Sequence, residues 1–420
     1  MKIVHITTCD YGGAGLAVLR IHDSLLQLGI DSSVLVADKR TSLSTVFQVE
    51  PTATLNTNKK PSNKLLKVTK NILRRRGWFL TNLEKYRKMF NSLKKADQEV
   101  CFTFPITSYD LAEDELVKEA DVIHLHWVAD FVDYPTFFKK VTKPIVWTFH
   151  DENIGLGGFH YQCAKDEYYD IYQPLEDAFC GIKREALAYC HNLYVVALSN
   201  KMKAFVDGLD FLKPRKKTII HNSVNHERFR IIDKAYSRDL FHVPRENLVF
   251  SFCANEIGDE RKGLKELIMA LELLGDNNIT LLCIGPGELP IDPSFHTICI
   301  GKIDNEDVLA ALYSCSDRFV MPSFQEAFAQ TPLEAMACGV PVIVFPCSGT
   351  EELINDDNGV RCKDFTVEAL FLGIKESLKR QYNNHKIRND VMSRFAPRLI
   401  AEQYLQVYKM AIDESDKCNE

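Results

Sequence analysis

The chain has 420 residues, a hydrophobic fraction of 46% and a formal net charge of −6, which suit two α/β domains with complete cores. No apolar run approaches the roughly 18 residues of a spanning helix, so the composition excludes a protein that crosses the membrane. Thirteen cysteines and the lack of a secretion signal indicate a reducing compartment, so we expect a cytoplasmic protein.

The N-terminal residues predict a strand, a glycine-rich turn, an amphipathic helix and a second strand, the unit that opens a parallel sheet. Gly12, Gly13 and Gly15 allow the tight turn that follows the first strand. Open α/β sheets bind ligands at the carboxyl ends of their strands, so we expect Gly12 and Gly13 near a ligand. The alternative is a compact turn with no further role.

A basic segment, 58–95, departs from the overall acidity of the chain. It contains Glu84 as its single acid and interleaves apolar residues that include Trp78. This pattern favours an amphipathic helix on a membrane surface, where each Lys or Arg contributes about 1 kcal/mol of attraction to anionic lipid. The first alternative is a solvated helix that packs its apolar face on the N-terminal domain. A nucleic-acid patch is disfavoured because the chain shows no recognisable reader module, and we expect no nucleic-acid partner.

Two further strands end in polar residues. His126 and Trp127 close the first of them, and His150 and Asp151 follow the second. An imidazole at the carboxyl edge of a sheet can bond a ligand oxygen, and we expect the neighbouring carboxylate to set its orientation or charge. His160 follows in the same loop region.

A metal site is not expected in this region. Zinc sites need four Cys or His ligands with short paired spacings, which the nearby histidines and cysteines do not offer. Ordinary buried thiols are the favoured reading of the cysteines, and we predict no metal and no cofactor.

The second half of the chain repeats the strand–loop–helix pattern. Arg261 and Lys262 precede a helix that begins near Gly263, and two fixed cations beside a helix N-terminus suit a diphosphate. A solvated pair of loop residues is the alternative. Farther on, Lys302 and Ile303 follow another strand, where a plain connection to the next helix is nearly as good a reading.

The segment SFQEAFAQTPLEAMACGVPV follows a short buried strand that ends at Met321. Thr331 and Pro332 predict a helix start, because a hydroxyl can cap the first turn and Pro suits the first helical position. The backbone of Ala329, Gln330 and Thr331 would then face a diphosphate. Glu334 in the first turn can accept hydrogen bonds from a vicinal diol, and Glu326 can meet hydroxyls beyond the phosphates.

This segment, with the GTEE that follows it, resembles the donor-site signature of the retaining nucleotide-sugar glycosyltransferases of family four. The order HLHW, TFHD and GGFHY resembles a subgroup that acts in cell-surface polysaccharide synthesis, with Phe159 where that subgroup has a cysteine. Ala329 also departs from the family, which usually has Gly after Phe328, so the loop is expected to sit slightly differently. Asn255 stands near the place of a family arginine.

The resemblance implies the GT-B fold, which consists of two facing Rossmann-like α/β domains with parallel sheets and an interdomain cleft. It divides the chain into an acceptor domain, 1–226, a donor domain, 227–397, and a C-terminal helix, 398–420, that crosses back to the first domain.

The resemblance also implies transfer of a sugar from a nucleoside diphosphate to a glycan or lipid-linked glycan, with retention and without a metal. The expected catalytic residues are His150, Asp151 and Glu326. The expected donor-binding residues are Gly13, Asn255, Arg261, Lys262, Lys302, Ile303, Phe328, Ala329, Gln330, Thr331 and Glu334. The expected acceptor-side residues are Gly12, His126, Trp127 and His160. The enzyme is expected in the cytoplasm, with 58–95 bringing it to the membrane face.

Two other functions stay open at this point. A nucleotide-sugar epimerase would consume the donor without an acceptor. A catalytically inactive scaffold would keep the fold and bind a membrane or protein partner.

Overall fold

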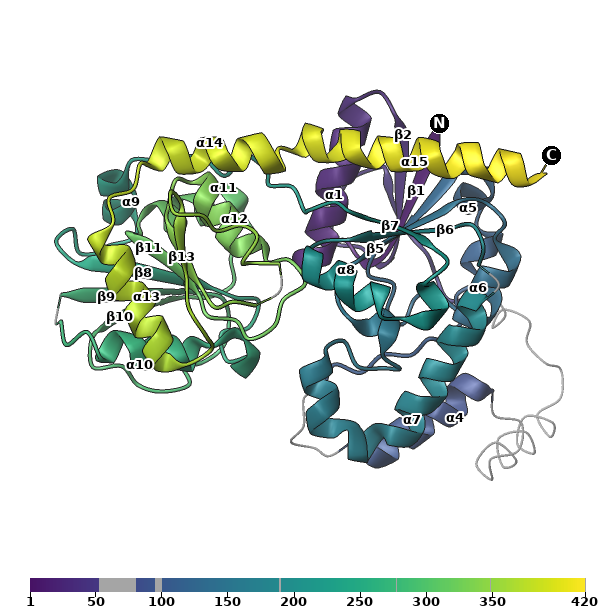
Figure 1. Ribbon diagram of the computed structural model, residues 1–420, viewed down its shortest axis with the longest axis horizontal. Coiled ribbons are helices and arrows are strands. Elements are labelled where there is room, and N and C mark those ends of the chain that lie inside the picture. The colour runs from purple at the N-terminus through teal and green to yellow at the C-terminus, as the bar shows by residue number, and fades with distance from the viewer. Residues whose placement is uncertain (53–80, 95–99, 189, 277, 348, 420) are drawn as a thin grey trace, which may run out of the picture. The chain divides into compact units, whose positions relative to one another are not determined.

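The computed structural model describes residues 1–52, 81–94, 100–188, 190–276, 278–347 and 349–419 (Figure 1). These residues form two compact units. The first consists of 1–197, 203–218 and 405–420, and the second of 198–202 and 219–404. The domain boundaries expected from the sequence stay a prediction.

A seven-stranded sheet organises the first unit, with strand order β3-β2-β1-β4-β5-β6-β7. The strands are β1 (Lys2–Cys9), β2 (Asp31–Asp38), β3 (Val46–Gln48), β4 (Val122–Leu125), β5 (Ile145–Phe149), β6 (Leu193–Ala197) and β7 (Lys216–Ile219). The pairings β1·β2, β2·β3, β1·β4, β4·β5 and β5·β6 are parallel. The helices and 3₁₀ turns are α1 (Gly12–Gln27), α4 (Asn82–Leu93), η2 (Leu111–Glu113), α5 (Glu115–Glu119), α6 (Tyr134–Lys140), η3 (Asn153–Gly155), α7 (Gln162–Ala188), α8 (Asn200–Asp207) and η4 (Asp210–Leu212).

The second unit holds a six-stranded sheet of order β10-β9-β8-β11-β12-β13, in which all five pairings are parallel. The strands are β8 (Leu248–Cys253), β9 (Ile279–Ile284), β10 (His296–Ile300), β11 (Arg318–Met321), β12 (Val342–Val344) and β13 (Gly359–Arg361). The helices are α9 (Lys234–Leu240), η5 (Glu260–Lys262), α10 (Leu264–Glu272), α11 (Glu306–Ser314), α12 (Gln330–Ala337), α13 (Val367–Lys379) and α14 (Asn384–Phe395). The last helix, α15 (Pro397–Asn419), belongs to the second unit up to Tyr404 and to the first unit from Leu405.

Helices cover both faces of the second sheet. Phe250 on β8 faces a core built with α10 and α13, whereas its neighbour Val249 faces a core built with α11, α12 and α14. Strands buried on both sides are expected in a parallel sheet. The prediction of two Rossmann-like domains with parallel sheets is therefore confirmed, while the expected cleft between them stays a prediction.

β4 is covered on both faces. All four of its residues are buried, and Trp127 lies beyond its end. Burial on both faces is expected for a central strand of a parallel sheet.

The described part of the basic segment packs on the protein. α4 begins with a capping box between Thr81 and Glu84. The ring of Phe90 on α4 stacks on Phe102 and on Tyr172, with centroids 5.5 Å apart in each case. For 82–93 this favours the alternative of a helix packed on the N-terminal domain, whereas 58–80 and Lys95 lie outside the described residues. None of the described helices combines the length and apolarity needed to span a bilayer.

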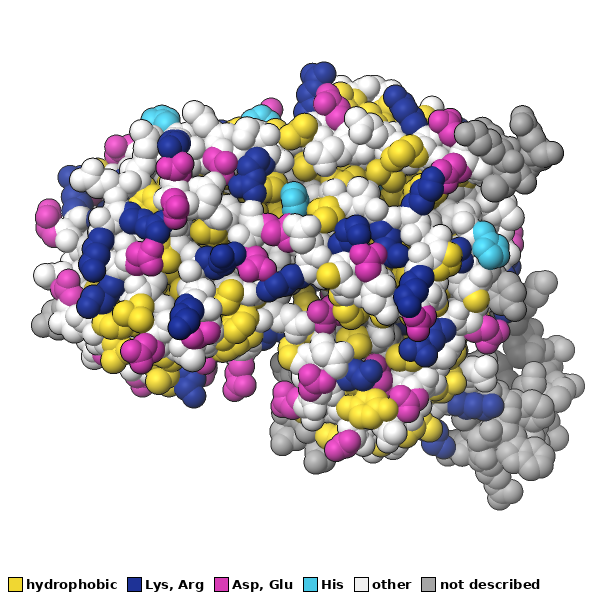
Figure 2. Space-filling view, viewed as in Figure 1, with side chains coloured by type: hydrophobic (Ala, Val, Ile, Leu, Met, Phe, Trp, Pro, Cys, Tyr) yellow, Lys and Arg dark blue, Asp and Glu magenta, His cyan; other side chains and the backbone are white. Residues whose placement is uncertain are grey.

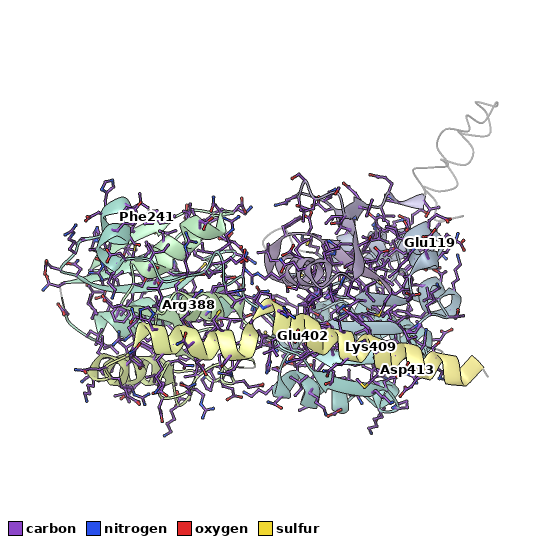
Figure 3. The ribbon with its side chains drawn as sticks, turned by 90° about the horizontal axis from the view of Figure 1, so that it is seen from above. Glu119, Phe241, Arg388, Glu402, Lys409 and Asp413 are labelled. Carbon is purple, nitrogen blue, oxygen red and sulfur yellow. The ribbon has the colours of Figure 1, made fainter. Side chains whose placement is uncertain are left out.

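The surface mixes charges of both signs. On the face drawn in Figure 2, Lys and Arg side chains of the described residues alternate with Asp and Glu side chains. Figure 3 shows the same mixture along the last helices, where Arg388 lies on α14 and Glu402, Lys409 and Asp413 lie on α15.

Candidate functional site

The strand order of each sheet marks one position for a ligand. Each order reverses direction once, between β1 and β4 in the first sheet and between β8 and β11 in the second. Open α/β sheets bind ligands beside the carboxyl ends of the strands at such a switch point. The loops after these four strands contain most of the site residues expected from the sequence.

Close backbone approaches hold the loops of the second unit together. Gly263 has φ +73°, and a Cβ there would collide with the carbonyl oxygen of Pro322. The Phe324 N–H donates to the Arg261 carbonyl at 2.9 Å. Gly349 has φ +74°, and a Cβ there would collide with the Ala327 carbonyl oxygen. The glycines therefore let the loops after β8 and β11 pack directly on one another and on the turn at Gly349.

A charged cluster occupies the centre of these loops. Lys262 Nζ donates to Glu326 Oε1 at 2.6 Å, and the Arg261 guanidinium lies 3.6 Å from the same oxygen. Arg261 also donates to the Gln325 carbonyl at 2.8 Å and to Asp259 at 3.0 Å. Burial opposes ionisation of Glu326, but the charges of Lys262 and Arg261 outweigh it and hold the pKa of the carboxyl below its usual value. Glu326 is therefore a largely buried carboxylate fixed by two cations.

The start of α12 differs from the sequence prediction. The helix begins at Gln330, its N-cap is Ala329 and no side chain caps it, so the predicted cap at Thr331 is wrong. Pro332 is tolerated because N–H groups of the first turn have no partner inside the helix. Glu334 consequently lies in the second turn rather than the first. It is buried, and Tyr313 Oη donates to its Oε2 at 3.4 Å.

Four further donor-side candidates have surroundings of their own. Asn255 is exposed, and Lys302 forms an exposed ion pair with Asp304 at 2.7 Å. Ile303 is partly buried against the core, and Phe328 stacks on His221 with centroids 5.2 Å apart. Their expected contacts with a nucleotide stay predictions.

In the first unit, five predicted residues line one small cavity at the carboxyl ends of β4 and β5. They are His126, Trp127, His150, Asp151 and His160. Gly12 and Gly13 begin α1, beyond the end of the neighbouring strand β1. Gly15 is the constrained glycine of that turn, since a Cβ there would lie 2.7 Å from the Asp10 carbonyl carbon.

Asp151 organises this cavity. Its Oδ2 accepts from Trp127 Nε1 at 2.7 Å and lies 2.5 Å from His160 Nδ1, and its Oδ1 accepts from the Asn153 N–H at 3.0 Å. His160 Nε2 lies 2.9 Å from Thr103 Oγ1. Burial disfavours the imidazolium, but the carboxylate of Asp151 outweighs it and raises the pKa of His160 to about 10. His160 is therefore a buried cation whose two ring nitrogens already have protein partners.

His150 is held by a different group from the one expected. Its Nε2 lies 3.2 Å from His126 Nδ1, so His126 and not Asp151 sets its orientation. Asp151 acts on its charge alone. Burial lowers the pKa of His150 to about 4, although the carboxylate of Asp151 opposes the shift. His150 is neutral at pH 7.

Two buried charges on α7 hold the loop that carries these residues, and the sequence reading missed both. The Glu176 carboxylate accepts from the N–H groups of Gly157 and Gly158 at 2.7 Å each. Lys183 Nζ donates to carbonyl oxygens of Asn153 and Leu156 at 2.6 and 2.9 Å, and burial lowers the pKa of Lys183 to about 8. The only sequence signal was a charged residue on the apolar stripe of a long helix.

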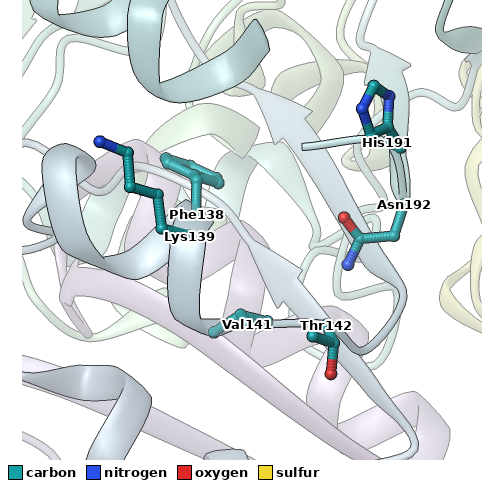
Figure 4. Close-up of a pocket in the computed structure, with 6 residues that line it drawn as sticks. All are labelled: Phe138, Lys139, Val141, Thr142, His191 and Asn192. Atoms are coloured by element: carbon teal, nitrogen blue, oxygen red, sulfur yellow. The ribbon is translucent and has the colours of Figure 1, made fainter. Parts of the chain in front are cut away.

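A second hollow lies at the opposite edge of the first sheet. Figure 4 shows Phe138, Val141 and Thr142 from the end of α6 facing His191 and Asn192, which precede β6. This is the amino edge, away from the switch point, and the predicted site residues do not line it.

The second unit matches a known protein family. Residues 248–380 match the family model described as Glycosyl transferases group 1. An uncharacterized glycosyltransferase of Methanocaldococcus jannaschii, MJ1607, is 26% identical over 71% of this chain and 77% of that protein. The capsular polysaccharide biosynthesis glycosyltransferase CapM of Staphylococcus aureus is 24% identical over 53% of this chain and 63% of its own length. An N,N'-diacetylbacillosaminyl-diphospho-undecaprenol alpha-1,3-N-acetylgalactosaminyltransferase of Campylobacter jejuni is 32% identical over 36% of this chain and 42% of its own.

Solved structures share the architecture along almost the whole chain. A sucrose-phosphate synthase from Thermosynechococcus elongatus has a TM-score of 0.68 at 15% identity and covers 99% of this chain and 100% of its own. HepE of Anabaena, solved in complex with UDP-glucose, has a TM-score of 0.56 at 15% identity and covers 98% and 100%. WaaG, a glycosyltransferase of lipopolysaccharide biosynthesis, has a TM-score of 0.54 at 16% identity and covers 99% and 98%.

The fold is thus that of the GT-B glycosyltransferases. The family match over the second unit and the curated relatives support a glycosyltransferase of group 1. The enzyme class predicted from the sequence is supported at this level, and the roles of the individual site residues stay predictions.

Proposed function

We propose that this protein transfers a sugar from a nucleoside diphosphate to a hydroxyl of a glycan or lipid-linked glycan, with retention and without a metal, in cell-surface polysaccharide biosynthesis. The observation that carries the proposal is the cluster of Arg261, Lys262 and Glu326 at the switch point of the second sheet. The names of the capsular and undecaprenol-linked relatives support the class of acceptor, and the UDP-glucose complex of HepE supports the class of donor.

In this reaction the bond between the anomeric carbon and the β-phosphate oxygen breaks, and its electron pair leaves with the diphosphate. The acceptor oxygen bonds to the anomeric carbon on the same face, and its proton passes to the departing phosphate oxygen. The products are a glycoside and a nucleoside diphosphate. In this proposal, Arg261, Lys262 and the N–H groups at the start of α12 stabilise the leaving charge.

The fixed carboxylate fits the sugar side of the donor. Glu326 is an acceptor-only group at neutral pH, and its two cations keep it ionised without titration near pH 7. A donor sugar presents hydroxyl hydrogens, which such a carboxylate can bind. Glu334, four residues after the start of α12, is the carboxylate proposed to bind the ribose diol.

The test is ligand binding followed by activity. UDP, GDP, ADP and their sugar conjugates are added to the full chain with and without EDTA, and the melting temperature is recorded. We expect one base to stabilise the protein by about 2.7 kcal/mol at 100 times its Kd, independently of EDTA. Glu334→Ala should lose this stabilisation, while Glu368→Ala, which removes an exposed glutamate on α13, should keep it.

The same samples separate the other functions. Release of the nucleoside diphosphate only when a glycan acceptor is added supports transfer. Consumption of the donor without an acceptor would instead identify an epimerase or a hydrolase. A protein that no nucleotide stabilises at millimolar concentration would overturn the proposal in favour of a scaffold.

A further inference from the structure

Three buried histidines form a hydrogen-bonded chain that ends at the candidate site. His5 Nδ1 lies 3.0 Å from His126 Nε2, and His126 Nδ1 lies 3.2 Å from His150 Nε2. His5 lies on the central strand β1, and His126 follows the adjacent strand β4. The chain therefore crosses the sheet from its core to the cavity that His150 lines.

All three rings are neutral at pH 7. Burial, reinforced by neighbouring imidazoles, holds the pKa values of His5 and His126 well below the usual range, and burial lowers that of His150 to about 4. A neutral imidazole carries one proton, so it donates through one nitrogen and accepts through the other. Both nitrogens of His126 face another imidazole. The two hydrogen bonds must therefore run in the same direction along the chain.

His5, at the far end of this row of histidines, selects the direction of the hydrogen bonds. His5 Nε2 is fully buried and has no hydrogen-bond partner among the described residues. If the bonds ran from His150 toward His5, this nitrogen would carry a proton that nothing accepts. Buried N–H groups without an acceptor are rarer in proteins than acceptors without a donor. The favoured direction runs from His5 to His126 to His150.

We propose that this hydrogen-bonded row of histidines fixes His150 with its proton on Nδ1. His126 is the positioning residue that imposes this tautomer. Nε2 of His150 then accepts from His126, so His150 has no lone pair left with which to take a proton. Any hydrogen bond that it makes to a bound group is one in which Nδ1–H donates. That the bound group is a sugar or phosphate oxygen rests on the proposed function; the tautomer itself does not.

The same histidines suggest one other reading, a metal site. Nitrogens of His5, His124 and His126 lie within 4.8 Å of one another. However, His124 already bonds Tyr408 Oη at 2.7 Å and Thr148 Oγ1 at 2.9 Å, and both nitrogens of His126 are used in the chain. Hydrogen bonding accounts for every nitrogen of the group except His5 Nε2.

The test reads the tautomers directly. The full chain is labelled with ¹⁵N-histidine, and long-range ¹H–¹⁵N correlation spectra are recorded at pH 7 without nucleotide sugar or acceptor. We expect His5, His126 and His150 all to carry the proton on Nδ1, by about tenfold or more over the other form. Free histidine prefers Nε2, so the pattern differs from that of an unconstrained ring.

Two variants of His126 then separate positioning from packing. In His126→Asn the amide nitrogen takes the place of Nδ1 and still donates, so His150 should keep its proton on Nδ1. In His126→Leu the donor is lost, and His150 should shift toward the Nε2 form. His22→Leu is the matched control, because His22 is a buried histidine of the same unit whose ring nitrogens bond Ser32 and Thr45 and neither His126 nor His150 among the described residues.

Three results would overturn the proposal. The first is a wild-type His150 protonated on Nε2, and the second is a stoichiometric metal in the purified protein. The third is a His150 signal that flips in His126→Asn, or that stays unchanged in a folded His126→Leu. Because no substrate is present, failure of the transfer assay would leave this test intact, and the reverse also holds.

Discussion

The ion pair between Lys262 and Glu326 gives the sharpest prediction for the second unit. Lys262→Met keeps the length of the side chain and removes its charge. Removing one partner of a buried pair costs about 3–5 kcal/mol. Glu326 is 12% exposed, Lys262 is 21% exposed, and Arg261 stays 3.6 Å from the carboxylate. We therefore expect a loss smaller than this range, about 2 kcal/mol in the free energy of unfolding.

The assay is thermal unfolding of a double-mutant cycle with Glu326→Gln. A loss of about 2 kcal/mol corresponds to roughly 4–8 °C in the Tm of a unit of this size. The double variant should be more stable than Lys262→Met, because it no longer holds a largely buried carboxylate that has lost its closest cation. We expect a coupling energy of about 1 kcal/mol or more.

Lys265→Met is the matched control, since Lys265 is exposed at the start of α10, three residues away. It should leave the Tm within about 2 °C. Additive effects of the two single substitutions, with no recovery in the double variant, would refute the claim that Lys262 holds Glu326 as a buried carboxylate.

Three further predictions follow from the structure. The pKa of His160 is raised to about 10, so the stability that its charge contributes is complete below its unfolded pKa near 6.5 and is lost as the pH rises toward 10. The free energy of unfolding in urea should therefore fall more between pH 6.5 and pH 9.5 for wild type than for His160→Gln. Gly349→Ala should lower the free energy of unfolding by about 1–3 kcal/mol and raise the donor KM. Gly29 has a similar φ of +76° but open space around it, so Gly29→Ala should lower the free energy of unfolding less and leave KM unchanged. Equal losses of stability in the two variants would contradict the packing argument. Phe90→Ala should lower the free energy of unfolding by about 1–2 kcal/mol without any lipid present, while Met89→Ala on the exposed side of α4 should change it little. An unchanged melting curve for Phe90→Ala would favour the membrane-surface hypothesis for α4.

The order of elements was predictable because strands of parallel sheets are apolar runs. β5 and β8 stand out for this reason, and the glycine before α10 marks the helix start as expected. The helix start at α12 was not predictable from Thr331 and Pro332. The packing of Ala327 and Phe328 against Gly349, about twenty residues farther along, fixes where that loop ends, and a local pattern does not contain this information.

Contacts that depend on how the strands pair in the sheet were missed for a related reason. His5 pairs with His124 across β1 and β4, which are separated by more than a hundred residues. A histidine within an apolar strand looks like an isolated core residue until the pairing is known. Asp151 was recognised as a site residue, but its partners were assigned to its neighbour in sequence. Its observed partners, Trp127 and His160, are not its neighbours in sequence, and neighbours in an extended chain point to opposite sides.

Both units pair the charges of their candidate sites within the protein. In the second unit, Arg261 and Lys262 are matched by Asp259 and Glu326, so this cluster carries no net charge to attract a diphosphate over a distance. Under the proposed function, selectivity for a diphosphate would then come from directed N–H groups and from exchange of existing ion-pair contacts, both of which depend on geometry. In the first unit, the buried cation His160 is neutralised by Asp151, and His150 stays neutral. Each candidate site thus has its polar groups oriented by protein partners in the free protein. Under the proposed function, this arrangement costs least reorganisation when charge moves in the transition state.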